Sequence, residues 1–369
     1  MEIERVDIYK LNIPFVRPLK IPLGVMEGAR NVLIKLTTDT GLHGWGEASP
    51  FAPITGDTQE SNYATAQQLA LLIKGKNPLA IEARMAEINR FIVSEPSIRS
   101  AFDMALYDLL GKAANLPLYA LLGGERRDIR TDLTIGIQDT VEQIIHHAER
   151  ILAQGFEAIK LKVGRQGLED VAHVKAVRAF VGPNVPIKID ANQGWDYPTA
   201  VANLQAMQPF KLKYVEQPLA AWDFANLRRL RDKVTLPICA DESVFDHKDA
   251  FKLVTAGAVD YLNIKLGKSG GIHTALKINA IAEAAGCKCM IGCFAESRLA
   301  LTASVHLALA CSNIHFFNLD SAYDLKEDPV IGGMAYHEEI GGLIQLSDAP
   351  GHGAEINEDY LDSHSHITI

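Results

Sequence analysis

Eight short apolar segments recur in the sequence after Thr131, and stretches with a helical spacing of apolar residues separate them. Parallel strands require crossover helices of this kind, so the alternation predicts a parallel sheet. Eight such units favour a (β/α) barrel over an open, doubly wound sheet. The candidate strands are residues 131–137, 158–164, 185–190, 211–217, 236–241, 259–265, 287–292 and 314–320.

The part of the chain before the barrel has a different pattern. Candidate strands that are broken by Gly44 and Gly46 come first, and two helical stretches follow them. We therefore expect an α+β domain over residues 1–125 and the barrel over residues 126–320. The Gly-rich tail, from about residue 321 to 369, is expected to pack back onto the first domain.

Ionisable residues stand at the C-terminal ends of five successive candidate strands. They are Lys162, Asp190, Glu216, Asp241 and Lys265, which are 28, 26, 25 and 24 residues apart. The C-terminal ends of barrel strands meet at one mouth, which is where barrel enzymes have their active sites. We therefore expect these side chains to form a ring at that mouth.

The three acids of this ring, Asp190, Glu216 and Asp241, come from neighbouring strands. Without a cation they would repel one another and raise each other's pKa. A set of oxygen ligands of this kind suits Mg²⁺, a hard ion that keeps positions open for substrate. The alternative, in which each acid pairs with a surface base or caps a helix, suits a single acid better than three in register.

The two lysines of the ring stand on either side of the acids. In a barrel the second and sixth strands lie on opposite sides, so Lys162 and Lys265 should face each other across a ligand. A lysine must lower its pKa from ~10.4 to about 7–8 to act as a base at neutral pH. Lys160, on the same strand face as Lys162, and a nearby dication would both act in that direction. The alternative, lysines that reach solvent from an edge strand, fits poorly with their apolar neighbours.

The overall charge and the cysteine content exclude several classes of protein. Acidic residues outnumber basic ones by 45 to 36, whereas a nucleic-acid binder would show a basic stripe. The first residues lack a secretory signal, and no stretch approaches the ~20 apolar residues of a membrane span. Five cysteines, an odd number, indicate reduced thiols. We expect a cytoplasmic homo-oligomer that binds neither nucleic acid nor membrane.

The segments that carry these residues resemble a known family. "KLK", "IKIDANQGW", "YVEQPL", "ADES" and "NIKLGKSGG" together resemble the enolase superfamily in its muconate-lactonizing subgroup, and the chain is similar to the dipeptide epimerases of that subgroup, such as L-Ala-D/L-Glu epimerases. The resemblance covers essentially the whole chain. It implies an α/β fold in which a TIM-like (β/α)7β barrel carries an N-terminal α+β capping domain.

The resemblance also implies a mechanism. The enzyme would be an isomerase that holds one Mg²⁺ per subunit on the three carboxylates. One of the two ring lysines removes the α-proton next to the substrate carboxylate, giving an enediolate, and the other returns a proton on the opposite face. By the same resemblance Lys160 supports the substrate carboxylate. Glu296 is a polar residue near the mouth that binds substrate, and Asn192 is a supporting polar residue there.

The substrate side of the site is implied by fewer residues. Dipeptide epimerases carry an Asp-x-Asp after the eighth strand that binds the substrate's ammonium group, and this chain has Asn318 and Asp320 at those places. One carboxylate therefore remains, unless Asp320 is only a turn residue at the strand end. Thr134, at the end of the first barrel strand, is expected to touch the substrate.

Two loops of the capping domain, residues 17–28 and 49–57, are expected to close over the site. L-Ala-D/L-Glu epimerases tend to carry an arginine where this chain has Gly24, so an uncharged or hydrophobic dipeptide is the expected substrate. N-acylamino acid racemase, o-succinylbenzoate synthase and cycloisomerase reactions are the alternatives. A barrel that only binds a ligand would not need two opposed lysines.

Overall fold

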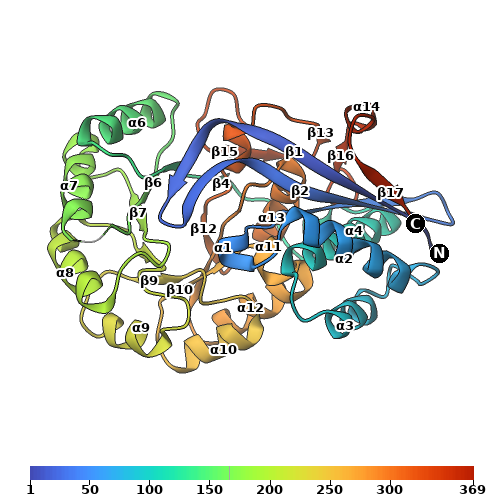
Figure 1. The fold of residues 1–369 in the computed structure, drawn as a ribbon, viewed down its shortest axis with the longest axis horizontal. Helices are drawn as coiled ribbons and strands as arrows, with labels where there is room; N and C mark the ends of the chain where they lie inside the picture. Colours follow the sequence, from blue (N-terminus) through green and yellow to red (C-terminus); the bar gives the residue numbers. More distant parts are fainter. Residues whose placement is uncertain (166) are drawn as a thin grey trace.

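The computed structural model describes residues 1–165 and 167–369. An antiparallel sheet with its helices lies beside an eight-stranded sheet that curls into a barrel (Figure 1). The elements of the first part are β1 (Ile3–Ile21), β2 (Gly24–Thr38), β3 (His43–Ala48), α1 (Ala52–Thr55), α2 (Gln59–Ile73), α3 (Ile81–Phe91), α4 (Pro96–Ala114) and α5 (Leu118–Leu121).

The expectation that Gly44 and Gly46 break a strand was wrong, because both lie inside β3. A side chain at Gly46 would place its Cβ 1.9 Å from the carbonyl oxygen of Ala101 on α4, and one at Gly44 would lie 2.3 Å from that of Ala105. The two glycines therefore let α4 pack directly against the backbone of β3. They mark a close helix–strand contact and not a turn.

The barrel confirms the alternation read from the sequence, because each of the eight candidate segments contains one strand. Its strands follow the parallel order β5 to β12 around the sheet. They are β5 (Leu133–Ile135), β6 (Ile159–Lys162), β7 (Ile187–Asp190), β8 (Val215–Glu216), β9 (Ile238–Ala240), β10 (Tyr261–Ile264), β11 (Lys288–Ile291) and β12 (Ile314–Phe317).

Helices on the outside connect these strands, as the parallel order requires. Figure 1 shows them as a ring around the sheet. They are α6 (Val141–Ala153), α7 (Glu169–Val181), α8 (Tyr197–Met207), α9 (Phe224–Arg231), α10 (His247–Thr255), α12 (Ile272–Ala284) and α13 (Arg298–Ala310). The short η1 (Gln208–Phe210) and α11 (Leu266–Ser269) lie between them, and the short strand β4 (Ile129–Arg130) precedes the barrel. Within residues 1–165 and 167–369, seven crossovers and eight strands give the expected (β/α)7β arrangement.

Side chains connect the two edge strands of the curled sheet. The backbone N–H of Thr134 donates to Asp320 Oδ2 at 2.8 Å, and the N–H of Leu319 donates to Thr131 Oγ1 at 2.8 Å. Residues within and just before β5 are therefore held against residues just after β12. Three of the predicted substrate residues, Thr134, Asn318 and Asp320, lie at this seam.

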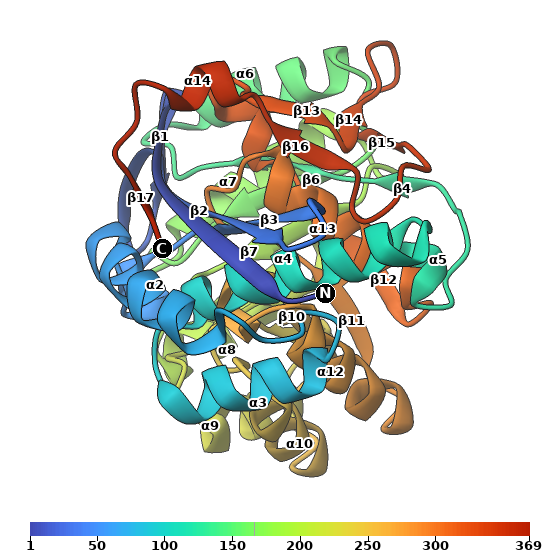
Figure 2. The ribbon, with the colours of Figure 1, turned by 90° about the vertical axis from the view of Figure 1, so that its right-hand side faces the viewer.

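The last part of the chain contributes strands to both earlier parts. β17 pairs with β1 and forms an edge of the antiparallel sheet, so the two termini lie on the same sheet (Figure 2), and β15 pairs with β4. The elements of this part are η2 (Ser321–Asp324), β13 (Val330–Gly332), β14 (Met334–Tyr336), β15 (Leu343–Leu346), β16 (Ala354–Ile356), α14 (Glu358–Leu361) and β17 (His366–Thr368). Val330 and Ile356 of this tail are buried in one apolar cluster with Leu11 and Ile13 of β1.

The segment 17–28 is not a loop, as the sequence suggested, but a β-hairpin. β1 and β2 continue to the pair Ile21–Gly24, and a two-residue turn joins them. The tip docks on the loop after β5, where the N–H of Ile137 donates to the Lys20 carbonyl at 2.8 Å and Lys20 Nζ lies 3.0 Å from Asp139 Oδ1. The hairpin therefore extends over the barrel mouth, as Figure 1 shows.

Two findings concern the expectations about membrane spans and cysteines. Among the described residues no helix is long and apolar enough to cross a bilayer. All five cysteines are free thiols.

Candidate active site

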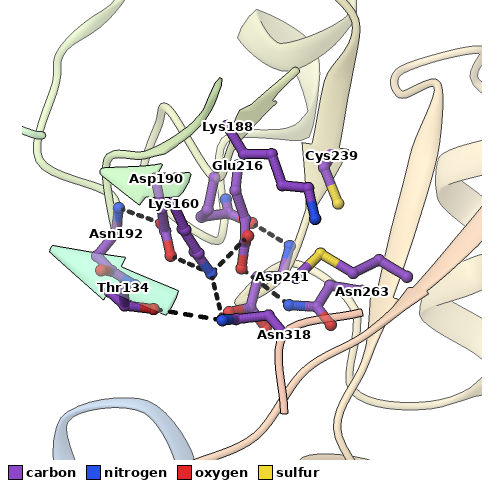
Figure 3. Close-up of polar contacts among 12 residues, drawn as sticks. Thr134, Lys160, Lys188, Asp190, Asn192, Glu216, Cys239, Asp241, Asn263 and Asn318 are labelled. Carbon is purple, nitrogen blue, oxygen red and sulfur yellow. Dashed lines mark hydrogen bonds and ion pairs between the residues drawn. The ribbon is translucent and has the colours of Figure 1, made fainter. Parts of the chain in front are cut away.

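Three carboxylates come together at the mouth of the barrel (Figure 3). Asp190 is the last residue of β7, Glu216 is the last residue of β8, and Asp241 follows β9 directly. The strand register places Asp190 beside Glu216, and all three side chains are fully buried. The structure thus gathers the acids that the sequence placed at three successive strand ends.

The carboxylates perturb one another. Burial, followed by the charge of Asp190, raises the pKa of Glu216 to about 7. Burial by itself would raise the pKa of Asp190 too, but the ammonium groups of Lys160 and Lys162 outweigh it and lower that pKa to about 2. The pKa values of the two acids therefore differ from their ordinary values in opposite directions. Two lysines lie beside Asp190, whereas Glu216 has one lysine and the repulsion of Asp190.

Lys160 lies between two of the acids. Its Nζ is 3.0 Å from Asp190 Oδ2 and 2.8 Å from Glu216 Oε2, and its side chain is only 2% exposed. Burial lowers the pKa of Lys160, but the charges of Asp190 and Glu216 raise it well above its ordinary value. Lys160 is therefore a fixed cation, and two lysines on one strand are tolerated because carboxylates surround them.

Lys162 and Lys265 reach the same cavity from strands at different positions of the sheet. Lys162 Nζ lies 2.7 Å from Asp190 Oδ2 and 2.8 Å from Asn192 Oδ1. Lys265, directly after β10, lies 2.8 Å from Asp241 Oδ2 and above the ring of Phe294. β7, β8 and β9 separate the two lysine-bearing strands.

The expected fall in lysine pKa does not occur at Lys265 in the protein alone. Burial lowers the pKa of Lys265, but Asp241 and Glu216 raise it by more, because the charged groups next to it are mainly acids. A cation that neutralised these acids would remove this effect.

The site fits a magnesium ion by its chemistry. In the described part of the chain, no three acidic, histidine or cysteine side chains are already gathered tightly enough to enclose an ion. The ammonium groups of Lys160 and Lys265 contact the same carboxylates instead. Three buried and mutually repelling carboxylates are nevertheless the oxygen-only set that a hard dication stabilises.

A cavity extends from the lysines to the capping hairpin. Its polar wall contains Lys160, Lys162, Lys265, Asn192, Thr134, Asn318 and Asp320, so most of the predicted site residues meet there. Its opposite wall is apolar and comes largely from the cap. That wall contains Phe15, Leu19, Ile21, Met26, Phe51, Ile54 and Phe294.

Asn318 is engaged by the protein at both of its polar atoms. Its Oδ1 accepts from Lys160 Nζ at 3.1 Å, and its Nδ2 donates to Asp132 Oδ1 at 2.9 Å and to Thr134 Oγ1 at 3.3 Å. Asp320 accepts the backbone N–H of Thr134 at Oδ2 and the Cys293 thiol at Oδ1, 3.8 Å away, and burial raises its pKa. Asp324 lines the same cavity, but Asp320 is the carboxylate at the predicted ammonium-binding position.

Asn192 and Glu296 take different positions. Asn192 contacts Lys162 and also donates to Glu242 Oε1 at 3.1 Å, so it orients the lysine. Glu296 accepts from the N–H of Phe294, and burial raises its pKa to about 8. Within the described residues Glu296 is not one of those that line the cavity, so its contact with substrate stays a prediction.

Sequence reasoning missed a second layer of polar residues beneath the mouth. Asn263 Nδ2 donates to Glu216 Oε1 at 2.8 Å, and Lys188 Nζ pairs with Asp132 Oδ2 at 2.7 Å. Each of these three residues lies two positions before a residue of the mouth, so the two-residue strand period could have found them. Lys268 was also missed, and it contacts Asp241 at 2.6 Å.

Comparisons with known proteins agree with this geometry. Residues 5–123 match the model of the mandelate racemase / muconate lactonizing enzyme N-terminal domain, and residues 143–360 match that of the enolase C-terminal domain-like family. The chain is 40% identical to the hydrophobic dipeptide epimerase of Enterococcus faecalis, over 96% of this chain and 99% of that one.

Two solved structures are similar over almost the whole chain. The dipeptide epimerase from Cytophaga hutchinsonii, complexed with Mg and the dipeptide D-Ala-L-Val, has a TM-score of 0.98 and 36% identity and covers all of both chains. The dipeptide epimerase from Enterococcus faecalis V583, complexed with Mg and the dipeptide L-Leu-L-Tyr, has a TM-score of 0.93 and 40% identity over 96% of this chain and all of that one.

Proposed function

This chain belongs to the mandelate racemase / muconate lactonizing enzyme family of the enolase superfamily, and on that premise we propose that it is a magnesium-dependent dipeptide epimerase. The observation that carries the proposal is the placement of two lysines, Lys162 and Lys265, on one cavity at either end of a row of buried carboxylates. A pair of this kind can take a proton from one face of a carbon and return one to the other.

The carboxylates of Asp190, Glu216 and Asp241 would hold the ion. When it is bound, Mg²⁺ stabilises the negative charge that builds up on the substrate carboxylate as the α-proton leaves. Lys160 lies at the centre of the carboxylates and adds a fixed positive charge on the same side. The neutral form of one lysine takes the α-proton, and the ammonium of the other gives its proton to the opposite face. A positioned base typically contributes ~10²–10⁴-fold to the rate.

The two walls of the cavity support a hydrophobic dipeptide. Asp320 can pair with the substrate's ammonium group, since Asn318 is already bonded at both polar atoms. Side chains of the dipeptide would lie against the apolar cap wall, where Leu19, Met26 and Phe51 offer no partner for an acidic group. Relatives that act on hydrophobic dipeptides fit the same picture.

A second candidate is the racemisation of N-acylamino acids by the same two lysines. The observation that favours it is the amide Asn318 at the first of the two positions that bind an ammonium group, so that only the second, Asp320, is a carboxylate. An acyl group carries no positive charge and would need less negative charge around it. Cytoplasmic location and homo-oligomer formation stay predictions.

The test is incubation of a dipeptide panel with enzyme and Mg²⁺ in D₂O, followed by mass spectrometry and chiral analysis. We expect α-deuterium uptake at the residue that carries the carboxylate, together with interconversion of its epimers. Lys162→Ala and Lys265→Ala should each abolish interconversion, whereas Lys233→Ala, a change on the exposed surface, should not. Dehydration or ring opening in place of epimerisation, or exchange confined to N-acylamino acids, would contradict the proposal.

A further inference from the structure

Lys268 is a fully buried lysine that the mechanism above does not use. It lies in α11, one helical turn after Lys265, and its N–H donates to the Lys265 carbonyl at 3.0 Å. Its Nζ donates to three oxygens, which are Asp241 Oδ1 at 2.6 Å, the carbonyl of Asp241, and the carbonyl of Asn263 at 3.0 Å. A lysine ammonium has three hydrogens, so all of them are used.

These contacts exclude a direct part in proton transfer. The side chain of Lys268 has no exposed surface, and among the described residues it is not one that lines the cavity. Its effect must therefore pass through Asp241. Because Lys268 holds Oδ1, the other oxygen, Oδ2, is directed to Lys265 at 2.8 Å.

The opposite side of the site is built differently. Lys162 is held by Asp190 and by the amide oxygen of Asn192, and Lys268 contacts neither of these residues. One catalytic lysine thus depends on Lys268 through a single shared carboxylate, and the other does not.

We propose that Lys268 is a positioning residue that fixes the Asp241 carboxylate and thereby places the ammonium of Lys265 for proton transfer on one face of the substrate only. The inference rests on the proposed function. If Lys268 is lost, Asp241 is free to rotate and to draw Lys265 away from the cavity. Since partners that orient a ligand or base typically contribute ~10–100-fold, the loss should fall in that range for one face.

The role predicts how magnesium binding changes. Lys268 carries the same sign of charge as the ion, and its removal leaves Asp241 with one ammonium partner fewer. Affinity for Mg²⁺ should therefore stay the same or increase when Lys268 is replaced, even though one proton transfer slows.

The experiment uses Lys268→Met with wild-type enzyme, at saturating Mg²⁺. Exchange of the α-proton for deuterium without inversion is measured separately for the two epimers, and Lys265→Ala identifies the epimer that depends on Lys265. We expect Lys268→Met to slow exchange of that epimer by ~10–100-fold and to change the other by less than about twofold. Calorimetry without substrate then gives the affinity for Mg²⁺. If Lys268→Met does not fold, Lys268→Gln is measured by the same criteria.

A matched control is Lys188→Met, which also removes a buried ion pair inside the barrel but touches neither Asp241 nor Lys265. Lys188→Met should change the rate of α-proton exchange by similar factors for the two epimers. The inference would be overturned if Lys268→Met slowed exchange equally for both epimers, changed neither exchange rate, or bound Mg²⁺ more weakly than wild type. If wild-type enzyme exchanges neither epimer of any dipeptide, the proposed function fails and this inference fails with it; if both exchange and only the split is missing, the inference alone fails.

Discussion

Replacement of Lys160 by methionine would remove the cation that two of the carboxylates share. Lys160 is 2% exposed and lies within 3.0 Å of both Asp190 and Glu216. Removing one partner from a buried ion pair typically costs about 3–5 kcal/mol, because the remaining charge is left without compensation. Glu216 would lose its ammonium partner, while Asp190 would keep Lys162. We therefore expect Lys160→Met to lower the free energy of unfolding of the metal-free protein by about that amount.

Magnesium should restore part of this loss. An ion that binds only the folded state at 100 times its Kd adds about 2.7 kcal/mol to wild-type stability. In Lys160→Met the ion also neutralises Asp190 and Glu216, so the gain should exceed the wild-type gain by about 1.4 kcal/mol or more, which corresponds to tenfold tighter binding.

Urea unfolding of both proteins, with and without Mg²⁺, measures these differences. Lys35→Met is the matched control, since Lys35 is a largely buried lysine of the capping sheet that pairs with Glu358. Its cost should be the same with and without the ion. If Mg²⁺ stabilises Lys160→Met no more than wild type, Lys160 is not the counter-charge of the metal-binding acids and the assigned ligand set is refuted.

Three further predictions concern the metal, acid stability and the substrate's ammonium group. Removal of metal with EDTA should abolish α-proton exchange measured in D₂O, and added Mg²⁺ should restore it; exchange that persists without metal would contradict the carboxylate site. Burial lowers the pKa of His306 from 6.5 to about 3, so below about pH 6.5 the unfolded chain binds a proton that the folded protein does not, and stability falls as the pH falls toward 3. Wild type should therefore lose about 2 kcal/mol more of its unfolding free energy between pH 7 and 5 than His306→Gln does, as measured by urea unfolding. An equal loss in the two proteins would contradict the lowered pKa of His306. Asp320→Asn should raise KM for dipeptides by roughly 10–100-fold, the value of a charge-assisted hydrogen bond, and leave N-acylated substrates unaffected; equal effects on both would show that Asp320 does not bind the ammonium group.

Much of the site could be predicted because it follows from local periodicity. A barrel strand exposes every second residue to the interior, and its last residue lies at the mouth wherever the strand comes in the order. Lys162, Asp190 and Glu216 could be placed from the sequence for that reason, and so could their meeting point. The same two-residue period also predicts that Lys188, two residues before Asp190, and Asn263, two residues before Lys265, point into the barrel.

Other features depend on contacts between distant parts of the chain. The position of Asn318, bonded to Lys160 and Asp132, is set at the seam between the first and last strands, which are more than 180 residues apart. Gly46 was predicted to break a strand, but it lies within β3 because α4 packs directly against its backbone.

The sequence alone determined the order of strands and helices, the residues at the strand ends and the ionic character of the site, because each depends on spacing along the chain. Only the tertiary structure decided which ammonium group lies against which carboxylate, how the capping hairpin covers the cavity, and that Lys268 points to Asp241. The direction in which a buried side chain points, and the group that it contacts, are set by the packing of several strands together. No single stretch of sequence contains that information.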